Sequence, residues 1–310
     1  MKYRIITYIG IFQVIVIGVF VYNIFSQKRV LGVAVNTISN ESVKVIPSGN
    51  LKHFFEPVEG NQPDPNKSFS ISNSINVDTL NERFEYKPMK EKGTYRVVAL
   101  GDSFTFGLHV STDDNWTELL EEKLNKQFVC TNISKFEVIN LGVSGYDRAY
   151  AVERFKKRGV KYSPDLVMWL DTSPFRDTEK IYRRLEKLPE GIPPTRRHNE
   201  YYIKVQNELV SEASNSDLEN TLFSSTLEIN KYYDGQLLLL TFPFMSSAEL
   251  QALEKIPKLR KETSFYSNLP DLYKNNLAFE NDGHPNSKGH KVISEDIINH
   301  LISSKLIPCK

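Results

Sequence analysis

The sequence lacks a surplus of charge of either sign. Its 39 lysine and arginine residues nearly balance its 38 aspartate and glutamate residues, so the formal net charge is only +1. A dedicated nucleic-acid binder usually carries a marked basic excess, so this class is not expected. Long runs of one charge and internal repeats are also missing. What remains is a globular composition, 40% hydrophobic and 25% charged, with enough apolar material for a sizeable core.

Cysteine is nearly absent, since the chain holds only Cys130 and Cys309. Two cysteines allow at most one intramolecular bridge. An oxidising compartment would permit that bridge, but the sequence does not give the distance between the two residues. Two free thiols is the favoured interpretation, and the pairing stays open.

Charged residues are missing altogether from residues 5–25, which are rich in Ile, Val and Phe and have basic residues on both sides. A helix of this length would just cross a bilayer core of ~30 Å. We therefore predict a membrane anchor over residues 1–29, with the following domain outside the cytoplasm. The alternative is a cleaved signal peptide with a small-residue site near GVAVN, which would give a secreted protein.

Residues 30–94 are rich in Asn, Ser, Pro and charged residues. The stretch VEGNQPDPNKS has the composition of turns and linkers, whereas the composition of residues 74–88 is less typical of a linker. We predict a linker whose later part packs on the edge of the domain that follows.

From residue 95 to the C-terminus, strand-like and helix-like patterns alternate. Buried-strand patterns cover residues 95–100, 136–142, 164–170 and 235–244. Helical patterns cover residues 113–128, 147–162, 200–233, 247–259 and 286–306. This alternation predicts one α/β domain, residues 95–310, with a parallel sheet covered by helices on both faces. Residues 177–200 are the least regular part, and we interpret them as an inserted basic loop or lid.

Chemically active residues follow three predicted strands and precede the last predicted helix. The first strand ends in GDSFTFG with Ser103, the second in NLGVSG with Gly145, and the third in DTSPF. Downstream, ENDGHPNSKGH places Asp282 and His284 just before the last helix. Because the carboxyl ends of parallel strands share one edge of the sheet, we expect these segments to meet there.

Together these residues meet the needs of nucleophilic acyl transfer. A serine hydroxyl needs a base to take its proton, and a carboxylate can orient an imidazole for that task. Backbone amides beside glycine can stabilise the developing oxyanion. The simpler interpretation is that Ser103 is only a helix cap, for which serine is also favoured.

In this order, GDSFTFG, NLGVSG and DGHPNSKGH resemble blocks I, II and V of the SGNH or GDSL hydrolases. The resemblance implies a three-layer α/β/α fold with a central parallel, flavodoxin-like sheet. It implies ester hydrolysis, often of acylated lipids or carbohydrates, without a metal or organic cofactor. Ser103 would be the nucleophile, His284 the base and Asp282 its partner. The amides of Ser103 and Gly145 would be oxyanion donors.

Two departures from the family pattern stand out. The third block usually supplies an asparagine as an oxyanion donor, but here it reads LDTSPFRD, so Thr172 and Ser173 are the candidate substitutes. The last block is often Asp-x-x-His, whereas here one glycine separates Asp282 from His284. This spacing resembles that of membrane-associated relatives that move acetyl groups on polysaccharides.

Three further residues near these motifs receive plainer interpretations. We expect Asp102 to hold the turn after the first strand and His290 to be structural or to lie at the surface. His109 could line the site, although a surface position is favoured.

We predict an anchored, extracytoplasmic serine esterase or deacylase acting on an acylated carbohydrate or lipid. A polysaccharide O-acyltransferase is a close variant. The alternative from another class is a non-catalytic SGNH-like module that binds glycans or partners at the cell surface. The missing asparagine of the third block favours this alternative.

Overall fold

The computed structural model describes residues 51–57, 60–63, 72–128, 130–189, 192, 201–280 and 282–309. The anchor or signal peptide predicted for residues 1–29 lies outside this part of the chain. Among the described residues, no helix is both long enough and apolar enough to cross a membrane.

Five parallel strands form the central sheet, in the order β4-β3-β5-β6-β7. They are β3 (Thr94–Gly101), β4 (Lys135–Asn140), β5 (Leu166–Leu170), β6 (Gln236–Leu240) and β7 (Thr263–Tyr266). The apolar runs in β3, β5 and β6 are buried on both faces, as expected for a parallel sheet between helices. Sequence patterning missed β7, because this half-buried edge strand has no continuous apolar run.

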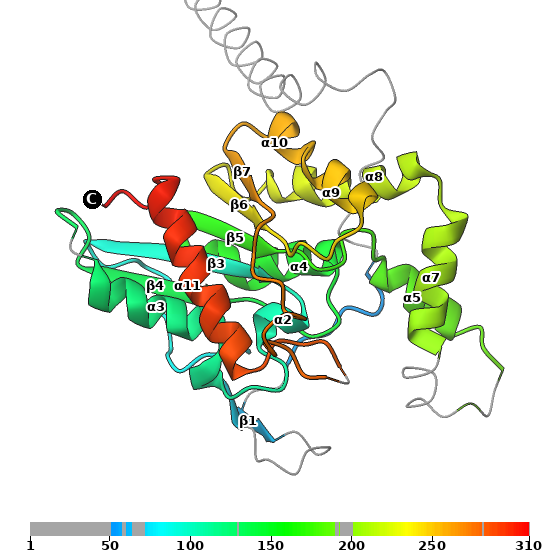
Figure 1. Cartoon of the computed structure of the whole chain (residues 1–310), viewed down its shortest axis with the longest axis horizontal. Coiled ribbons are helices and arrows are strands. Elements are labelled where there is room, and N and C mark those ends of the chain that lie inside the picture. The colour runs from blue at the N-terminus through cyan, green and yellow to red at the C-terminus, as the bar shows by residue number, and fades with distance from the viewer. Residues whose placement is uncertain are drawn as a thin grey trace, which may run out of the picture. The chain divides into compact units, whose positions relative to one another are not determined.

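Helices cover both faces of the sheet, so the predicted three-layer arrangement is present. Helices α3 (Trp116–Gln127) and α11 (Ser287–Ser303) pack side by side and share one hydrophobic core with the strands. Figure 1 shows α11 crossing in front of the strands, beside α3. On the other face lie α4 (Arg148–Arg154) and α8 (Asn215–Ile229), where the Arg148 guanidinium stacks 4.0 Å from the Trp169 ring.

The remaining helical segments are short. They are α2 (Ser103–Phe106), α5 (Thr178–Leu185), α7 (Tyr202–Glu212), α9 (Ser247–Leu253) and α10 (Ile256–Leu259). Short 3-10 helices occupy Thr112–Asp114 and Val160–Tyr162, and a π-helical turn occupies Phe155–Gly159. The mostly helical stretch predicted over residues 200–233 forms two helices, α7 and α8, because Ser214 forms a capping box that starts α8.

The interpretation of residues 177–200 as a loop or lid is wrong for the stretch that forms α5. Asp177 caps this helix by accepting a hydrogen bond from the Lys180 amide at 2.9 Å. Ile181 and Leu185, four residues apart, form a buried cluster with residues of α7. The basic residues that suggested a loop occupy the rest of the helix surface.

The segment before β3 is closely packed against the domain. Strand β1 (Gly60–Pro63) pairs antiparallel with β2 (Ser72–Ile75). Beyond β2, Leu80 is fully buried, and the side-chain amide of Asn81 donates to the Phe106 carbonyl at 2.6 Å. This part of the chain therefore supports α2, the helix that begins with Ser103.

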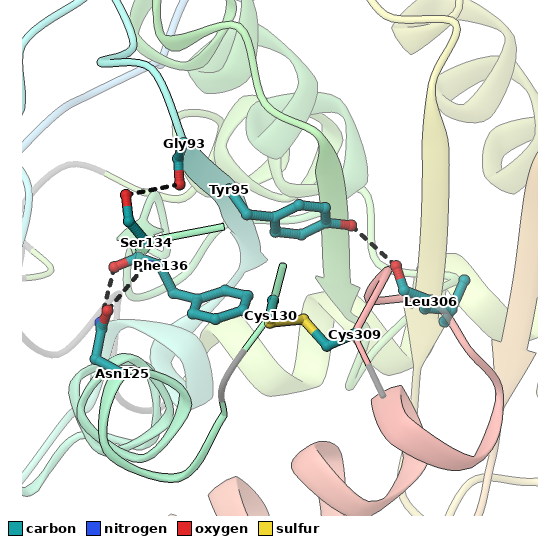
Figure 2. Close-up of a disulfide and its surroundings, with 8 residues drawn as sticks. All are labelled: Gly93, Tyr95, Asn125, Cys130, Ser134, Phe136, Leu306 and Cys309. Carbon is teal, nitrogen blue, oxygen red and sulfur yellow. Dashed lines mark hydrogen bonds between the residues drawn. A yellow bond between two sulfur atoms is a disulfide. The ribbon is translucent and has the colours of Figure 1, made fainter. Parts of the chain in front are cut away.

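Cys130 and Cys309 form a disulfide, with 4.9 Å between their Cα atoms (Figure 2). The interpretation of these residues as free thiols is therefore wrong. Cys130 follows α3 and Cys309 follows α11, and these two helices pack against each other. The Tyr95 hydroxyl also donates to the Leu306 carbonyl at 2.9 Å, which holds the C-terminal segment beside the sheet.

Candidate active site

Ser103 lies where β3 turns into α2, at the carboxyl edge of the sheet. The Asp102 carboxylate caps the helix by accepting from the Phe104 amide at 3.1 Å. A Cβ atom on Gly101 would lie 2.2 Å from Thr105 Oγ1, so only glycine allows this tight turn. The turn therefore fixes the position of the serine side chain, which is 8% exposed.

The loop after β4 approaches α2 closely because of its first glycine. A Cβ atom on Gly142 would lie 2.5 Å from the Phe106 amide nitrogen, which no ordinary side chain tolerates. Three residues later, Gly145 has a φ of +82°, in the left-handed region that glycine adopts without strain. The Gly145 carbonyl accepts from the Thr178 hydroxyl at 3.2 Å, so α5 holds this loop in place.

Ser103, His284 and Asp282 form one hydrogen-bonded chain. Ser103 Oγ lies 2.8 Å from His284 Nε2, and His284 Nδ1 is hydrogen-bonded to Asp282 Oδ1. An ionised carboxylate only accepts hydrogen bonds, so Nδ1 carries the proton and Nε2 is left to accept from the serine hydroxyl. The chain thus has the tautomer that a general base needs.

A tight turn before α11 presents the histidine and the aspartate together. The Phe279 amide donates to the His284 carbonyl at 2.9 Å, and Gly283 between the two side chains has a φ of +79°. The Asp282 Oδ1 atom also accepts from the His284 backbone amide at 3.0 Å. Partial burial opposes ionisation of Asp282, but the hydrogen bonds from His284 outweigh it and lower the pKa of this carboxyl.

His109, which we expected at the surface, belongs to this cluster. Its Nε2 atom lies 2.8 Å from Asp282 Oδ2, and its side chain is only 15% exposed. Its backbone has a φ of +74°, an uncommon conformation for any residue except glycine. Sequence reasoning could not find this contact, because 173 positions separate the two residues.

Thr172, one of the two candidate oxyanion donors in the loop after β5, has another partner. The Thr172 hydroxyl donates to Asp102 Oδ2, which also accepts from Arg176 Nη2 at 2.6 Å. This arrangement places Thr172 in the support of the Asp102 turn, and its hydroxyl proton is used there. Ser173 lines a cavity of about 510 Å³.

Asp171 directly follows β5 and is buried. Its buried carboxylate forms an ion pair with Arg148 of α4. Burial raises the pKa of Asp171, and the Arg148 charge opposes that rise. Asp171 therefore ties the end of β5 to α4.

His290 lies inside the domain, in the first turns of α11. It is fully buried, and its Nδ1 atom accepts from the Trp116 amide at 3.2 Å. Burial lowers the pKa of His290 to about 3, so its ring stays neutral. Trp116 in turn donates its indole N–H to the Phe104 carbonyl at 3.2 Å, which links His290 to α2.

One group of side chains has the composition of a metal site. His109, Asp282 and His284 each offer one ligand atom, and these atoms lie within 4.8 Å of one another. All three residues already take part in the hydrogen bonds described above, so a metal ion would have to displace those bonds.

No protein-family model matches the sequence, and no curated protein sequence is significantly similar to it. Solved structures do resemble the fold. One is a psychrotrophic esterase from Pseudoalteromonas sp., at 14% identity and a TM-score of 0.47, covering 68% of this chain and 99% of that one.

Two other solved structures show a similar likeness. An acetylxylan esterase from Geobacillus stearothermophilus has 17% identity and a TM-score of 0.45, covering 69% of this chain and 96% of that one. A two-domain esterase active on acetylated mannans has 17% identity and a TM-score of 0.41, covering 70% of this chain and 51% of that one. At these identities and TM-scores the likenesses carry no functional conclusion.

Proposed function

We propose that the protein is a serine hydrolase that cleaves esters through Ser103, His284 and Asp282. The observation that carries the proposal is the hydrogen-bonded chain from Ser103 Oγ to His284 Nε2, at 2.8 Å, and from His284 Nδ1 to Asp282. A serine that served only as a helix cap would need neither of these partners, and in α2 the capping group is the Asp102 carboxylate.

In the proposed reaction, Ser103 Oγ attacks the ester carbonyl carbon while its proton passes to His284 Nε2. The tetrahedral intermediate collapses, and His284 returns the proton to the departing alcohol oxygen. An acyl-enzyme on Ser103 is left. Water then attacks the acyl carbon, again giving a proton to His284. The carboxylic acid leaves as Ser103 regains its hydrogen.

Asp282 stabilises the imidazolium that forms twice in this cycle. Its lowered pKa keeps it ionised when His284 carries the extra proton. The backbone amides of Ser103 and Gly145 are the proposed oxyanion donors. Ser103 is the first residue of α2, so its amide has no partner within the helix. With no asparagine in the loop after β5, the proposed oxyanion hole depends on main-chain donors.

We further propose that the enzyme works outside the cytoplasm, anchored by residues 5–25 or released after cleavage. The uncharged apolar run supports the anchor. The disulfide between Cys130 and Cys309 supports an oxidising compartment. The proposed substrate is an acyl ester of a carbohydrate or lipid, and a sugar hydroxyl in place of water would make the same site an acyltransferase.

The direct test is hydrolysis of p-nitrophenyl acetate by the wild type and by Ser103→Ala. We expect turnover in the wild type and, in the variant, a loss of at least about a thousandfold with an unchanged melting curve. Ser111→Ala is a matched control, because Ser111 lies outside the hydrogen-bonded chain. Equal turnover by the wild type and Ser103→Ala would refute the triad. No labelling of Ser103 by a fluorophosphonate, together with no turnover, would favour the non-catalytic binding module.

A further inference from the structure

A continuous row of aromatic rings leads away from His284. Its ring centroid lies 4.9 Å from that of Phe104, which lies 5.7 Å from that of Phe242. Phe242 stacks on Phe244 at 5.1 Å, and Phe244 meets Tyr273 edge-on at 5.7 Å. These rings come from α2, from the segment after β6 and from the segment before the His284 turn. The row therefore joins three loops at the carboxyl edge of the sheet.

The two exposed rings stand at the end of the row, after the partly buried Phe104 and the buried Phe242. Phe242 is fully buried, Phe244 is 37% exposed and Tyr273 is 67% exposed. Burying a large aromatic ring is normally favourable, so a ring left this open next to a reactive serine calls for an explanation.

Tyr273 also touches the turn that holds the reactive groups. A Cβ atom on Gly283 would lie 3.2 Å from the Tyr273 hydroxyl oxygen. Gly283 separates Asp282 from His284, so the Tyr273 hydroxyl lies against the centre of this turn. The exposed ring is thus placed beside the proposed reaction centre and not at a remote surface.

We propose that the exposed ring of Tyr273, in edge-on contact with Phe244, is an aromatic platform that binds a sugar ring of an acylated glycan, so that the ester reaches Ser103. This inference rests on the proposed function and narrows its substrate from carbohydrate or lipid to carbohydrate. A sugar ring presents C–H groups on its face and hydroxyl groups at its rim, and it therefore needs a flat apolar surface with polar groups around it.

The surroundings of Tyr273 meet both needs. Its neighbours Asp271 and Lys274 form an ion pair of 3.1 Å, and the exposed residues Asn275 and Asn276 follow. These groups can exchange hydrogen bonds with sugar hydroxyls, and the Tyr273 hydroxyl can both donate and accept. A long acyl chain would gain most from enclosure by apolar walls, whereas this ring is open to water and bordered by charge.

The kinetic test uses Tyr273→Ala on three kinds of ester: p-nitrophenyl acetate, p-nitrophenyl octanoate, and a panel of acetylated xylose, mannose and glucosamine oligosaccharides. For the oligosaccharide that the wild type cleaves best, we expect KM to rise about five- to tenfold, which is the size of effect that aromatic contacts produce. We expect the constants for p-nitrophenyl acetate to stay unchanged. Phe84→Ala, at a half-exposed ring beside Arg83, is the matched control and should change neither.

A binding measurement separates this inference from the proposed chemistry. Ser103→Ala and the double variant with Tyr273→Ala are titrated calorimetrically with the same acetylated oligosaccharides. Weaker binding by the double variant supports the platform whether or not Ser103 is the nucleophile. Equal binding by the two variants overturns it. A KM that rises for the octanoate ester and not for the sugar esters also overturns it, and assigns the rings to an acyl chain.

Discussion

His109 allows the clearest separation of a catalytic effect from a structural one. His109 donates a hydrogen bond to Asp282 Oδ2. The other oxygen of this carboxylate, Oδ1, is hydrogen-bonded to His284. His109 adopts a left-handed backbone conformation, with a φ of +74°. Two substitutions separate the effect of the hydrogen bond from the effect of the backbone conformation. His109→Gly removes the imidazole and relieves the backbone strain, whereas His109→Ala removes the imidazole and keeps the strain.

The expected free energies follow from the two features. A hydrogen bond to a charged group contributes ~1.5–3 kcal/mol, and the lower end applies here because Asp282 is 33% exposed to water. The left-handed conformation costs a residue with a Cβ atom ~1–2 kcal/mol. For His109→Gly the two effects nearly cancel, so the free energy of unfolding should stay within ~1 kcal/mol of the wild type. His109→Ala should be less stable than the glycine variant by ~1 kcal/mol.

Catalysis should respond differently, because both variants leave Asp282 with one restraint fewer. We expect kcat for p-nitrophenyl acetate to fall about tenfold in each, equivalent to ~1.4 kcal/mol of transition-state stabilisation, with little change in KM. His109→Gln, whose amide can donate to the same oxygen, should recover part of the loss. The measurements are steady-state kinetics and urea unfolding on the same preparations. Full activity in His109→Gly would refute the positioning role, and a kcat that followed stability across the variants would reduce His109 to a structural residue.

Two further predictions concern stability. Cys130→Ser/Cys309→Ser opens a loop spanning 179 residues, for which the chain-entropy model predicts a loss of up to ~5 kcal/mol in the free energy of unfolding; identical urea curves with and without dithiothreitol would contradict the bridge. Burial, reinforced by nearby carboxylates, raises the pKa of Glu121 to about 7. The folded state therefore keeps a proton that the unfolded chain releases above the ordinary glutamate pKa of 4.5. Stability should fall as pH rises from 4.5 to about 7, by up to ~3 kcal/mol. Glu121→Gln should flatten this dependence, and an unchanged slope in urea titrations would show that Glu121 does not cause it.

The sheet could be predicted because its strands carry a strong local signal. Val97, Met168 and Leu238 belong to apolar runs that are buried on both faces, and such runs stand out in any window of the sequence. The edge strand β7 and the helix α5 carry weaker signals. Thr263 and Ser264 look like loop residues. They belong to a strand because their backbone pairs with β6, and their side chains give no sign of it. In α5, the apolar residues Ile181 and Leu185 are outnumbered by charged residues, of which Lys180, Arg183 and Arg184 lie at the helix surface.

The features of the site also fall into two groups: those that sequence motifs predict, and those that depend on contacts between residues far apart in the sequence. The close approach of Ser103 and His284 could be predicted from motif order, because a parallel sheet gathers its strand ends at one edge. The roles of Thr172 and Asp171 could not, because each depends on a partner brought by folding. Thr172 donates to Asp102, and Asp171 pairs with Arg148 from the opposite layer.

These two interactions show how the loop after β5, which contains no asparagine, supports the candidate site. The Asp102 carboxylate caps α2 with one oxygen and accepts from Thr172 and Arg176 with the other. The loop after β5 therefore contacts the turn that carries Ser103. A donor lost from the oxyanion position would cost a factor of ~10²–10³ in rate, whereas a displaced nucleophile would abolish the reaction. In the proposed mechanism, the contacts by which this loop holds the Ser103 turn therefore matter more to the rate than one further oxyanion donor would.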